Sequence, residues 1–313
     1  MSALIGLSTI VIASLVLIKS VELLVNSSWE MARRFRVSDY AISFFLVAIA
    51  TSLPEIVVGI TAAMSKNSIL SFGNAIGSNV ALVTLIIAIP VLINSGISTR
   101  ILIHTKDAYV ATIFSVLPLA LIFDGNLSRF DGGILLALYG VYMFFVLRRG
   151  DRPEEEERSV ETVNLWRNVS LFIFSLLLLF VASEAIVRGA LSLSASLNLN
   201  LGFVGLTITA IGTSLPEIAF AIGVVRTKHQ FEVLGNAVGS VVANSTVVLG
   251  LTAIVEPIVL TNSGMGFSSL LFSVFAALLF LRFVRTKESI STGEALILLL
   301  VYALFVAAEY YLR

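Results

Sequence analysis

Residues 48–56 read A-I-A-T-S-L-P-E-I, and residues 210–218 repeat them as A-I-G-T-S-L-P-E-I. The two copies begin 162 residues apart. A second stretch, G-N-A-I-G-S at 73–78, returns at the same spacing as G-N-A-V-G-S at 235–240, and Glu22 and Glu184 share that spacing. Long matches at one spacing indicate that the chain contains a duplicated unit.

The composition around these motifs is that of a membrane protein. Of the 313 residues 58% are hydrophobic and 13% are charged, with a mean hydropathy of +1.00. A soluble domain carries about 25% charged residues. The apolar residues fall into blocks of about 20, the length that crosses a bilayer as a helix. We expect ten spans, near 3–25, 40–64, 69–93, 106–123, 130–148, 167–190, 201–225, 231–256, 266–284 and 291–311.

Five spans in each half have a topological consequence. An odd number of crossings forces the second copy to enter the membrane upside down, which is an inverted repeat with its site expected at the midplane. The sequence therefore predicts an all-α membrane protein of ten transmembrane helices, built as two inverted five-helix repeats with broken helices at the midplane. The predicted units are a first repeat at 1–148, a linker at 149–166 and a second repeat at 167–313.

The distribution of Lys and Arg predicts the orientation. Fifteen of the 20 Lys and Arg residues lie in or beside odd-numbered connections, four lie in even-numbered connections or at the termini, and Lys19 lies inside the first span. Connections rich in Lys and Arg face the cytoplasm. We therefore expect a multi-pass cell-membrane protein with both termini outside and the 149–166 loop in the cytoplasm. The acidic run Glu154 to Glu157 is interpreted as part of a solvated linker.

Glu55 and Glu217, one in each copy of the first motif, lie inside apolar spans. An intramembrane carboxylate costs at least a few kcal/mol unless it is paired, so such residues usually mark an ion pathway. Both His residues fall in loops and no Lys or Arg lies at that depth, so a bound cation is the simplest partner. The alternative is a pair of protonated, hydrogen-bonded structural Glu residues.

A proline precedes each of these acids. Pro54 and Pro216 lack an N–H and disfavour the helical bond to the carbonyl four residues back, at Ala50 and Gly212. The same turns carry hydroxyl groups. Carbonyls, hydroxyls and a carboxylate are hard oxygen ligands that suit Na⁺ or Ca²⁺. The hydroxyl candidates are Thr51, Ser52, Thr213 and Ser214.

The second motif supplies small residues that let helices approach closely, and we expect packing to be its main role. Ser78 and Ser240, which end its two copies, are also candidate ligands, and so is Asn244 one turn further on. The counterpart of Asn244 in the first half is Leu82, so the predicted site is not symmetric.

These residues resemble the alpha repeats of the cation/calcium exchanger superfamily, most closely the prokaryotic sodium/calcium exchangers. The likeness covers nearly the whole chain, and both motifs occur in both halves. The resemblance implies that Glu55 and Glu217 bind Ca²⁺ and that flanking Na⁺ sites use the motif hydroxyls and two backbone carbonyls. It also implies that spans one and six move to alternate access. The implied flanking residues are Ala48, Thr51, Ser52, Ser78, Ala210, Thr213, Ser214 and Ser240.

The chain departs from the family pattern at three positions. Ala50 replaces a usual Gly, Leu82 replaces a usual Asn or Asp, and Asn244 stands where Asp is frequent. Leu82 removes a polar group from the middle of the site and bears on ion stoichiometry. The central loop is also too short for the regulatory calcium-binding domains of animal exchangers.

We therefore expect a secondary antiporter that exchanges Ca²⁺ for Na⁺, with the lipid bilayer as its surroundings and no cofactor, nucleic acid or obligate protein partner. The alternatives are exchange of Ca²⁺ for H⁺ or another cation, since protons compete for the carboxylates, and, from another class, a cation channel. An intramembrane enzyme is disfavoured because the chain has no Cys and no H-E-x-x-H. Glu22, Glu184, Glu294 and Glu309 lie near span ends and are expected at the interface.

Overall fold

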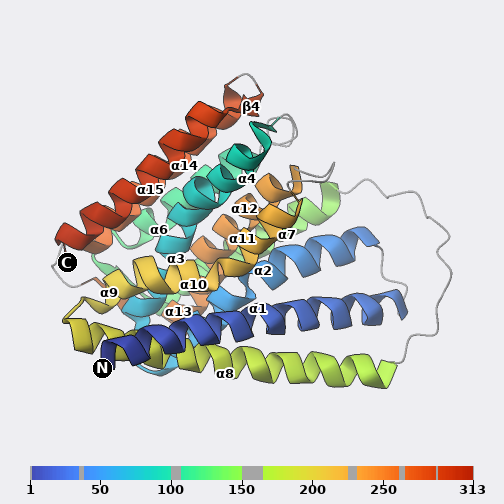
Figure 1. Cartoon of the computed structure of the whole chain (residues 1–313), viewed down its shortest axis with the longest axis horizontal. Helices are drawn as coiled ribbons and strands as arrows, with labels where there is room; N and C mark the ends of the chain where they lie inside the picture. The colour runs from blue at the N-terminus through green and yellow to red at the C-terminus, as the bar shows by residue number, and fades with distance from the viewer. Residues whose placement is uncertain are drawn as a thin grey trace.

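The chain folds into a bundle of tilted helices in the computed structural model (Figure 1). The structure describes residues 2–34, 39–99, 107–149, 165–224, 231–260, 265–286 and 288–312. The acidic run of the predicted linker and both His residues lie outside these ranges, and so do the side chains of residues 39–51.

The first half of the chain supplies the following elements. They are α1 (Ser2–Arg34), α2 (Asp39–Met64), α3 (Ser68–Ala81), the π-helical segment η1 (Leu82–Ile86), α4 (Ile87–Asn94), β1 (Ile97–Ser98), α6 (Asp107–Leu121), β2 (Asn126–Leu127) and α7 (Arg129–Arg149).

The second half has more interruptions. Its elements are α8 (Leu165–Leu197), α9 (Leu201–Val204), η2 (Gly205–Thr209), α10 (Ala210–Thr213), α11 (Leu215–Val224), α12 (Phe231–Ala243), η3 (Asn244–Val248), α13 (Leu249–Val255), β3 (Ile258–Val259), α14 (Met265–Arg285), β4 (Ser289–Ile290) and α15 (Thr292–Leu312).

The helical fold class is confirmed, and helices overlap every predicted span. Within the described residues, six helices are long and apolar enough to cross a membrane, or seven if the pair Leu201–Thr213 and Leu215–Ile222, bent by 43°, forms one span. Two further apolar helices, Ser52–Met64 and Ala108–Leu121, are shorter over their described parts.

The expected helix breaks occur in one half. In the second half the helix ends at Thr213 and resumes at Leu215, where Pro216 falls in the first turn and its missing N–H is not needed. In the first half, α2 runs through Pro54 as one helix, so the prediction of a break there was wrong. Packing of α2 against α1, α3 and α8 outweighs the local cost of the proline.

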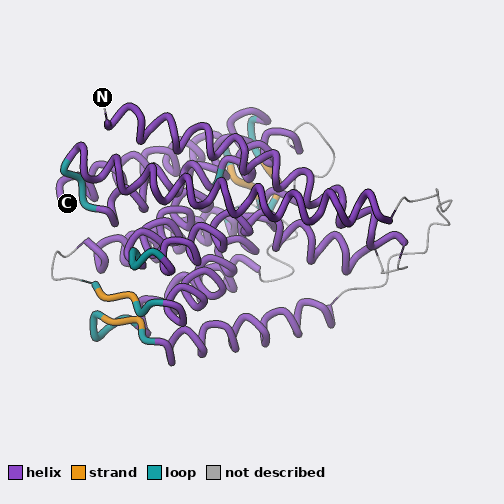
Figure 2. The backbone as a smooth tube through the Cα atoms, turned by 90° about the horizontal axis from the view of Figure 1, so that it is seen from below, coloured by secondary structure: helices purple, strands orange, loops and turns teal. Residues whose placement is uncertain are grey.

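The sequence analysis missed two short strand pairs. Ile97 of β1 pairs with Ile290 of β4, and Asn126 of β2 pairs with Val259 of β3, both antiparallel. Figure 2 shows the two orange pairs well apart in the molecule. Each pair joins a strand from one half to a strand from the other. The spacing of 162 residues between the motifs places β1 within one residue of β3, and β2 within one residue of β4.

The two longest helices, α1 and α8, pack along each other at one side of the bundle (Figure 1). A side chain on Gly6 would lie 3.0 Å from the carbonyl oxygen of Gly189, so glycine permits this close approach. Ile10, Leu17, Ile186 and other apolar residues fill the interface.

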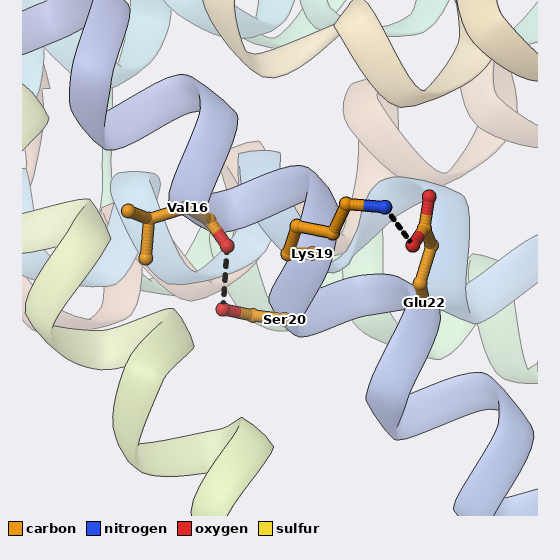
Figure 3. Close-up of polar contacts among 4 residues, drawn as sticks. All are labelled: Val16, Lys19, Ser20 and Glu22. Carbon is orange, nitrogen blue, oxygen red and sulfur yellow. Dashed lines mark hydrogen bonds and ion pairs between the residues drawn. The ribbon is translucent and has the colours of Figure 1, made fainter.

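Each of these two helices also carries an ion pair. The Lys19 Nζ atom lies 2.6 Å from the Glu22 carboxylate, beside a hydrogen bond from the Ser20 hydroxyl to the Val16 carbonyl (Figure 3). Arg188 Nε lies 2.7 Å from the Glu184 carboxylate. The side chains in both pairs remain partly or largely exposed, as expected for these acids.

The other two acids near span ends differ from each other. Glu294 caps α15, accepting hydrogen bonds from the backbone and hydroxyl of Ser291. Glu309 is buried inside the protein, and its carboxylate accepts a hydrogen bond from the Ser268 hydroxyl on α14. The expected exposure of Glu309 at the membrane interface is therefore not observed.

The second motif performs the packing role that its small residues predict. A side chain on Gly77 would overlap the backbone carbonyl of Leu206 in η2, and one on Gly73 would overlap that of Gly202. Helix α3 of the first half therefore lies directly against the segment that leads into the second copy of the first motif.

This contact predicts that Gly77→Ala destabilises the folded protein. The added methyl meets backbone atoms, which cannot move aside as a side chain can, so we expect a loss at or above about 3 kcal/mol, the upper part of the usual overpacking range. Thermal unfolding of the purified protein in detergent measures this change. Gly140→Ala, at an exposed position with open space around it, is the matched control and should unfold like wild type.

Candidate functional site

The two motif acids are among the most buried charged residues that the structure describes. Glu55 is 1% exposed and Glu217 is 2% exposed. The carboxylates lie close enough to interact electrostatically. Within the described residues neither has an ion-pair partner, and one oxygen of each, Oε2, has no hydrogen-bond partner. Two acids held together in an apolar interior favour a positive ligand.

Hydroxyl groups from both halves surround Glu55. The Ser214 hydroxyl lies 3.3 Å from Glu55 Oε1 and 3.1 Å from the Ser78 hydroxyl oxygen. Ser78 and Thr213 also approach the Glu55 carboxylate. The cluster therefore combines Glu55 from α2 and Ser78 from α3 with Thr213 and Ser214 from the break between α10 and α11.

The backbone at the break joins this cluster. The Ala210 carbonyl accepts hydrogen bonds from the hydroxyls of Thr213, at 3.3 Å, and Ser78, at 3.5 Å. The carbonyl oxygen of Ala210 therefore lies among hydroxyl oxygens, as its predicted role as a ligand requires. Oxygen atoms of these types are the ligands that Na⁺ and Ca²⁺ prefer.

Asn74 completes the cluster, and the sequence analysis gave it only a packing role. Its amide oxygen accepts a hydrogen bond of 3.0 Å from the Thr213 hydroxyl, and its side chain is fully buried. The signal that could have found it is an amide inside a block of small and apolar residues, since a buried amide needs partners.

Three further predicted ligands are buried to the same degree. Ser52 is fully buried, and its hydroxyl has no partner among the described residues. Ser240 on α12 and Asn244 at the start of η3 are each 1% exposed. Neither amide atom of Asn244 has a hydrogen-bond partner within the described part of the chain. Ala48 and Thr51 lie on α2, and their side chains are outside the described residues.

The asymmetry predicted at Leu82 has a structural setting. Leu82 begins η1 and Asn244 begins η3, and these two π-helical segments match at the motif spacing. Single π-helical turns inside α-helices are frequent at functional sites. Leu82 is 1% exposed and belongs to the apolar core, so one half offers an amide where the other offers hydrocarbon.

A further buried polar contact crosses between the halves beside this position. The Asn79 amide nitrogen donates to the Ser245 hydroxyl at 2.8 Å, and the amide oxygen of Asn79 has no partner in the described region. Neither residue is predicted from the sequence, because each lies next to a motif position and carries no charge.

Comparison with known proteins identifies the family of this chain. The family model described as sodium/calcium exchanger protein matches residues 5–148 and again residues 167–311. The inner membrane protein YrbG of Escherichia coli K12 is 28% identical over 269 residues, covering 81% of each chain. The sodium/calcium exchanger MaX1 of Methanosarcina acetivorans is 25% identical over 337 residues, covering 95% of this chain and 96% of that protein.

Solved structures agree with the sequence comparison. A sodium-calcium exchanger, NCX_Mj, is 26% identical and superposes with a TM-score of 0.68 over 97% of this chain and 99% of its own. The H⁺/Ca²⁺ exchanger CAX shares the fold, with a TM-score of 0.79 over 98% of this chain and 87% of its own at 17% identity. The chain belongs to the sodium/calcium exchanger family of membrane exchangers.

Proposed function

We propose that this protein exchanges Ca²⁺ for Na⁺ across the cell membrane by alternating access, with Glu55 and Glu217 holding the transported cation. The observation that carries the proposal is the pair of buried carboxylates, contributed by the two copies of one motif and surrounded by oxygen atoms from both halves. A bound cation would stabilise a charge arrangement that the apolar interior otherwise disfavours.

The architecture that we propose for this function is an inverted repeat of five spans in each half, with units at 1–148 and 167–313 joined by a cytoplasmic linker. Both termini then lie outside. Support comes from the strand pairs, which recur to within a residue of the motif spacing, and from η1 and η3, which recur at that spacing. It also comes from the imbalance of Lys and Arg between the two sets of connections.

The proposed ligand set follows the oxygen cluster. The two carboxylates form the calcium site, and the groups at either end form flanking sodium sites. One proposed flanking set is Ser78, Ala210, Thr213 and Ser214, whose oxygen atoms lie together beside Glu55, so Ser78 belongs with the second copy of the motif and not with the first. The other proposed flanking residues are Ala48, Thr51, Ser52 and Ser240, with Asn244 contributing an amide oxygen.

Charge arithmetic limits the number of Na⁺ ions that the proposed site can hold. Two ionised carboxylates with a neutral Asn244 carry a charge of minus two, which one Ca²⁺ or two Na⁺ neutralise. A third Na⁺ would leave an excess charge in a medium of low dielectric constant. Leu82 offers no oxygen to the middle of the site, so we propose that the end sites carry the sodium coupling.

The proposal predicts that Glu55→Gln and Glu217→Gln each abolish Ca²⁺ transport while the protein still inserts and purifies. Glutamine matches the shape and hydrogen-bonding capacity of a protonated glutamate but cannot neutralise a cation. Calcium uptake into proteoliposomes, driven in turn by Na⁺, K⁺ and H⁺ gradients, measures the effect.

The same uptake experiment separates the competing functions. Wild-type flux in either glutamine variant would mean that these residues are structural protonated acids. Uptake driven by an H⁺ gradient and not by a Na⁺ gradient would show that the protein exchanges Ca²⁺ for protons and not for Na⁺. Flux that needs no counter-ion would indicate a channel.

The carboxylates also predict a pH dependence. Protonation neutralises the groups that hold the cation, so exchange should fall as the pH drops below neutral and recover in part when Ca²⁺ is raised. The measurement is initial uptake over a grid of pH and Ca²⁺ concentrations. Inhibition that Ca²⁺ does not relieve would place the titrating group away from the site.

Asn74 provides a prediction from the structure alone. Asn74→Ala removes the nearer of two acceptors for the buried Thr213 hydroxyl and leaves only the Ala210 carbonyl, so we expect cation affinity to fall about tenfold. The apparent affinity for Ca²⁺ during uptake measures this loss. Asn67→Ala, in the connection between α2 and α3, is the control and should retain wild-type affinity.

A further inference from the structure

Helix α1 touches the second copy of the first motif through a residue outside both motifs. Ser14 is 1% exposed, and its hydroxyl has no hydrogen-bond partner within the described residues. A side chain built on Gly212 would place its Cβ 2.7 Å from the Ser14 hydroxyl oxygen and 3.9 Å from the Ser14 Cβ. Gly212 directly precedes Thr213 and Ser214 in the site.

The close neighbour, and not a special backbone conformation, excludes a side chain at Gly212. The matching position in the first half is Ala50, on the continuous helix α2, so the helical backbone of the motif accepts a methyl group there. Gly212 also lies in a helical segment, α10. The residue that matches Ser14 at the motif spacing is Leu176, which is exposed on α8. The contact of Ser14 with Gly212 therefore has no equivalent at that position in the other half.

A buried hydroxyl without a partner is costly, and alanine would fill most of the same space without that cost. The Ser14 oxygen meets a turn that carries two residues of the site. Ser214 follows Gly212 by two residues and lies 3.3 Å from Glu55 Oε1, while Thr213 holds Asn74 at 3.0 Å.

We infer that Ser14 is a positioning residue, which sets the placement of the Thr213–Ser214 turn through Gly212 and thereby sets the cation affinity of the site. This inference rests on the proposed function, in which the cluster around Glu55 binds the transported ion. It identifies a position at which a movement of α1 would displace the residues that bind the ion.

The test is a double-mutant cycle of Ser14→Ala and Gly212→Ala, with thermal unfolding and Ca²⁺ uptake measured for all four proteins. Gly212→Ala brings a methyl against the Ser14 oxygen, and we expect the Ca²⁺ concentration for half-maximal uptake to rise about tenfold. Adding Ser14→Ala removes the 2.7 Å contact and leaves two ordinary van der Waals contacts, with Ile10 Cγ2 at 3.6 Å and the Cβ of residue 14 at 3.9 Å. The double variant should therefore return to within about threefold of wild type.

Matched controls separate this contact from general effects of the substitutions. Ser175→Ala removes another buried serine hydroxyl, one that bonds to the Phe172 carbonyl on α8. Gly140→Ala adds a methyl in open space. Neither substitution should change the Ca²⁺ affinity, and neither should rescue Gly212→Ala.

The outcomes distinguish this inference from the proposed function. Rescue of affinity in the double variant supports it. A double variant as weak as Gly212→Ala, or variants that change unfolding temperature but not Ca²⁺ affinity, would overturn it. Wild-type protein that neither transports Ca²⁺ nor gains thermal stability from Ca²⁺ would instead overturn the proposed function.

Discussion

Two carboxylates buried beside each other without a fixed positive partner impose the main constraint on this structure. Glu55 and Glu217 come from opposite halves of the chain, and within the described residues no Lys or Arg pairs with either. A protein that keeps such a pair must either supply protons or admit a cation. The other buried polar groups around the pair are uncharged oxygens and amides, which stabilise a cation without permanently neutralising the acids.

The packing of the helices serves this pair. Gly73 and Gly77 let α3 pack closely against η2. This packing places Asn74 and Ser78 of α3 within hydrogen-bond distance of Thr213 and Ser214, respectively. A larger residue at either glycine would overlap the backbone of the segment that leads into the second copy of the first motif, so one of the two helices would have to shift. The second motif therefore acts on the first by setting the distance between the halves.

The sequence was enough to predict that the two acids lie inside apolar helices, the helical class and the approximate helix ranges, because each follows from a local pattern or from the duplication. It did not predict which copy of the motif breaks its helix, since Pro54 and Pro216 have the same local sequence and differ in tertiary packing. It missed the strand pairs, whose two-residue lengths carry no periodic signal. Asn74 and Ser14 were missed as functional candidates because their partners lie 139 residues away in one case and on another helix in the other.

The strand pairs have a mechanical consequence. Since β1 of the first half is bonded to β4 of the second, and β2 of the first half to β3 of the second, each half is clasped to the other at two separate places. Backbone bonds from Thr99 to Glu288 and from Leu260 to Gly125 reinforce the two clasps. A rigid-body rotation of one half against the other would break the backbone hydrogen bonds of both strand pairs. Helices α1 and α8 carry neither strand and lie together at one side of the bundle, so the strand bonds place no direct restraint on a shift of these two helices.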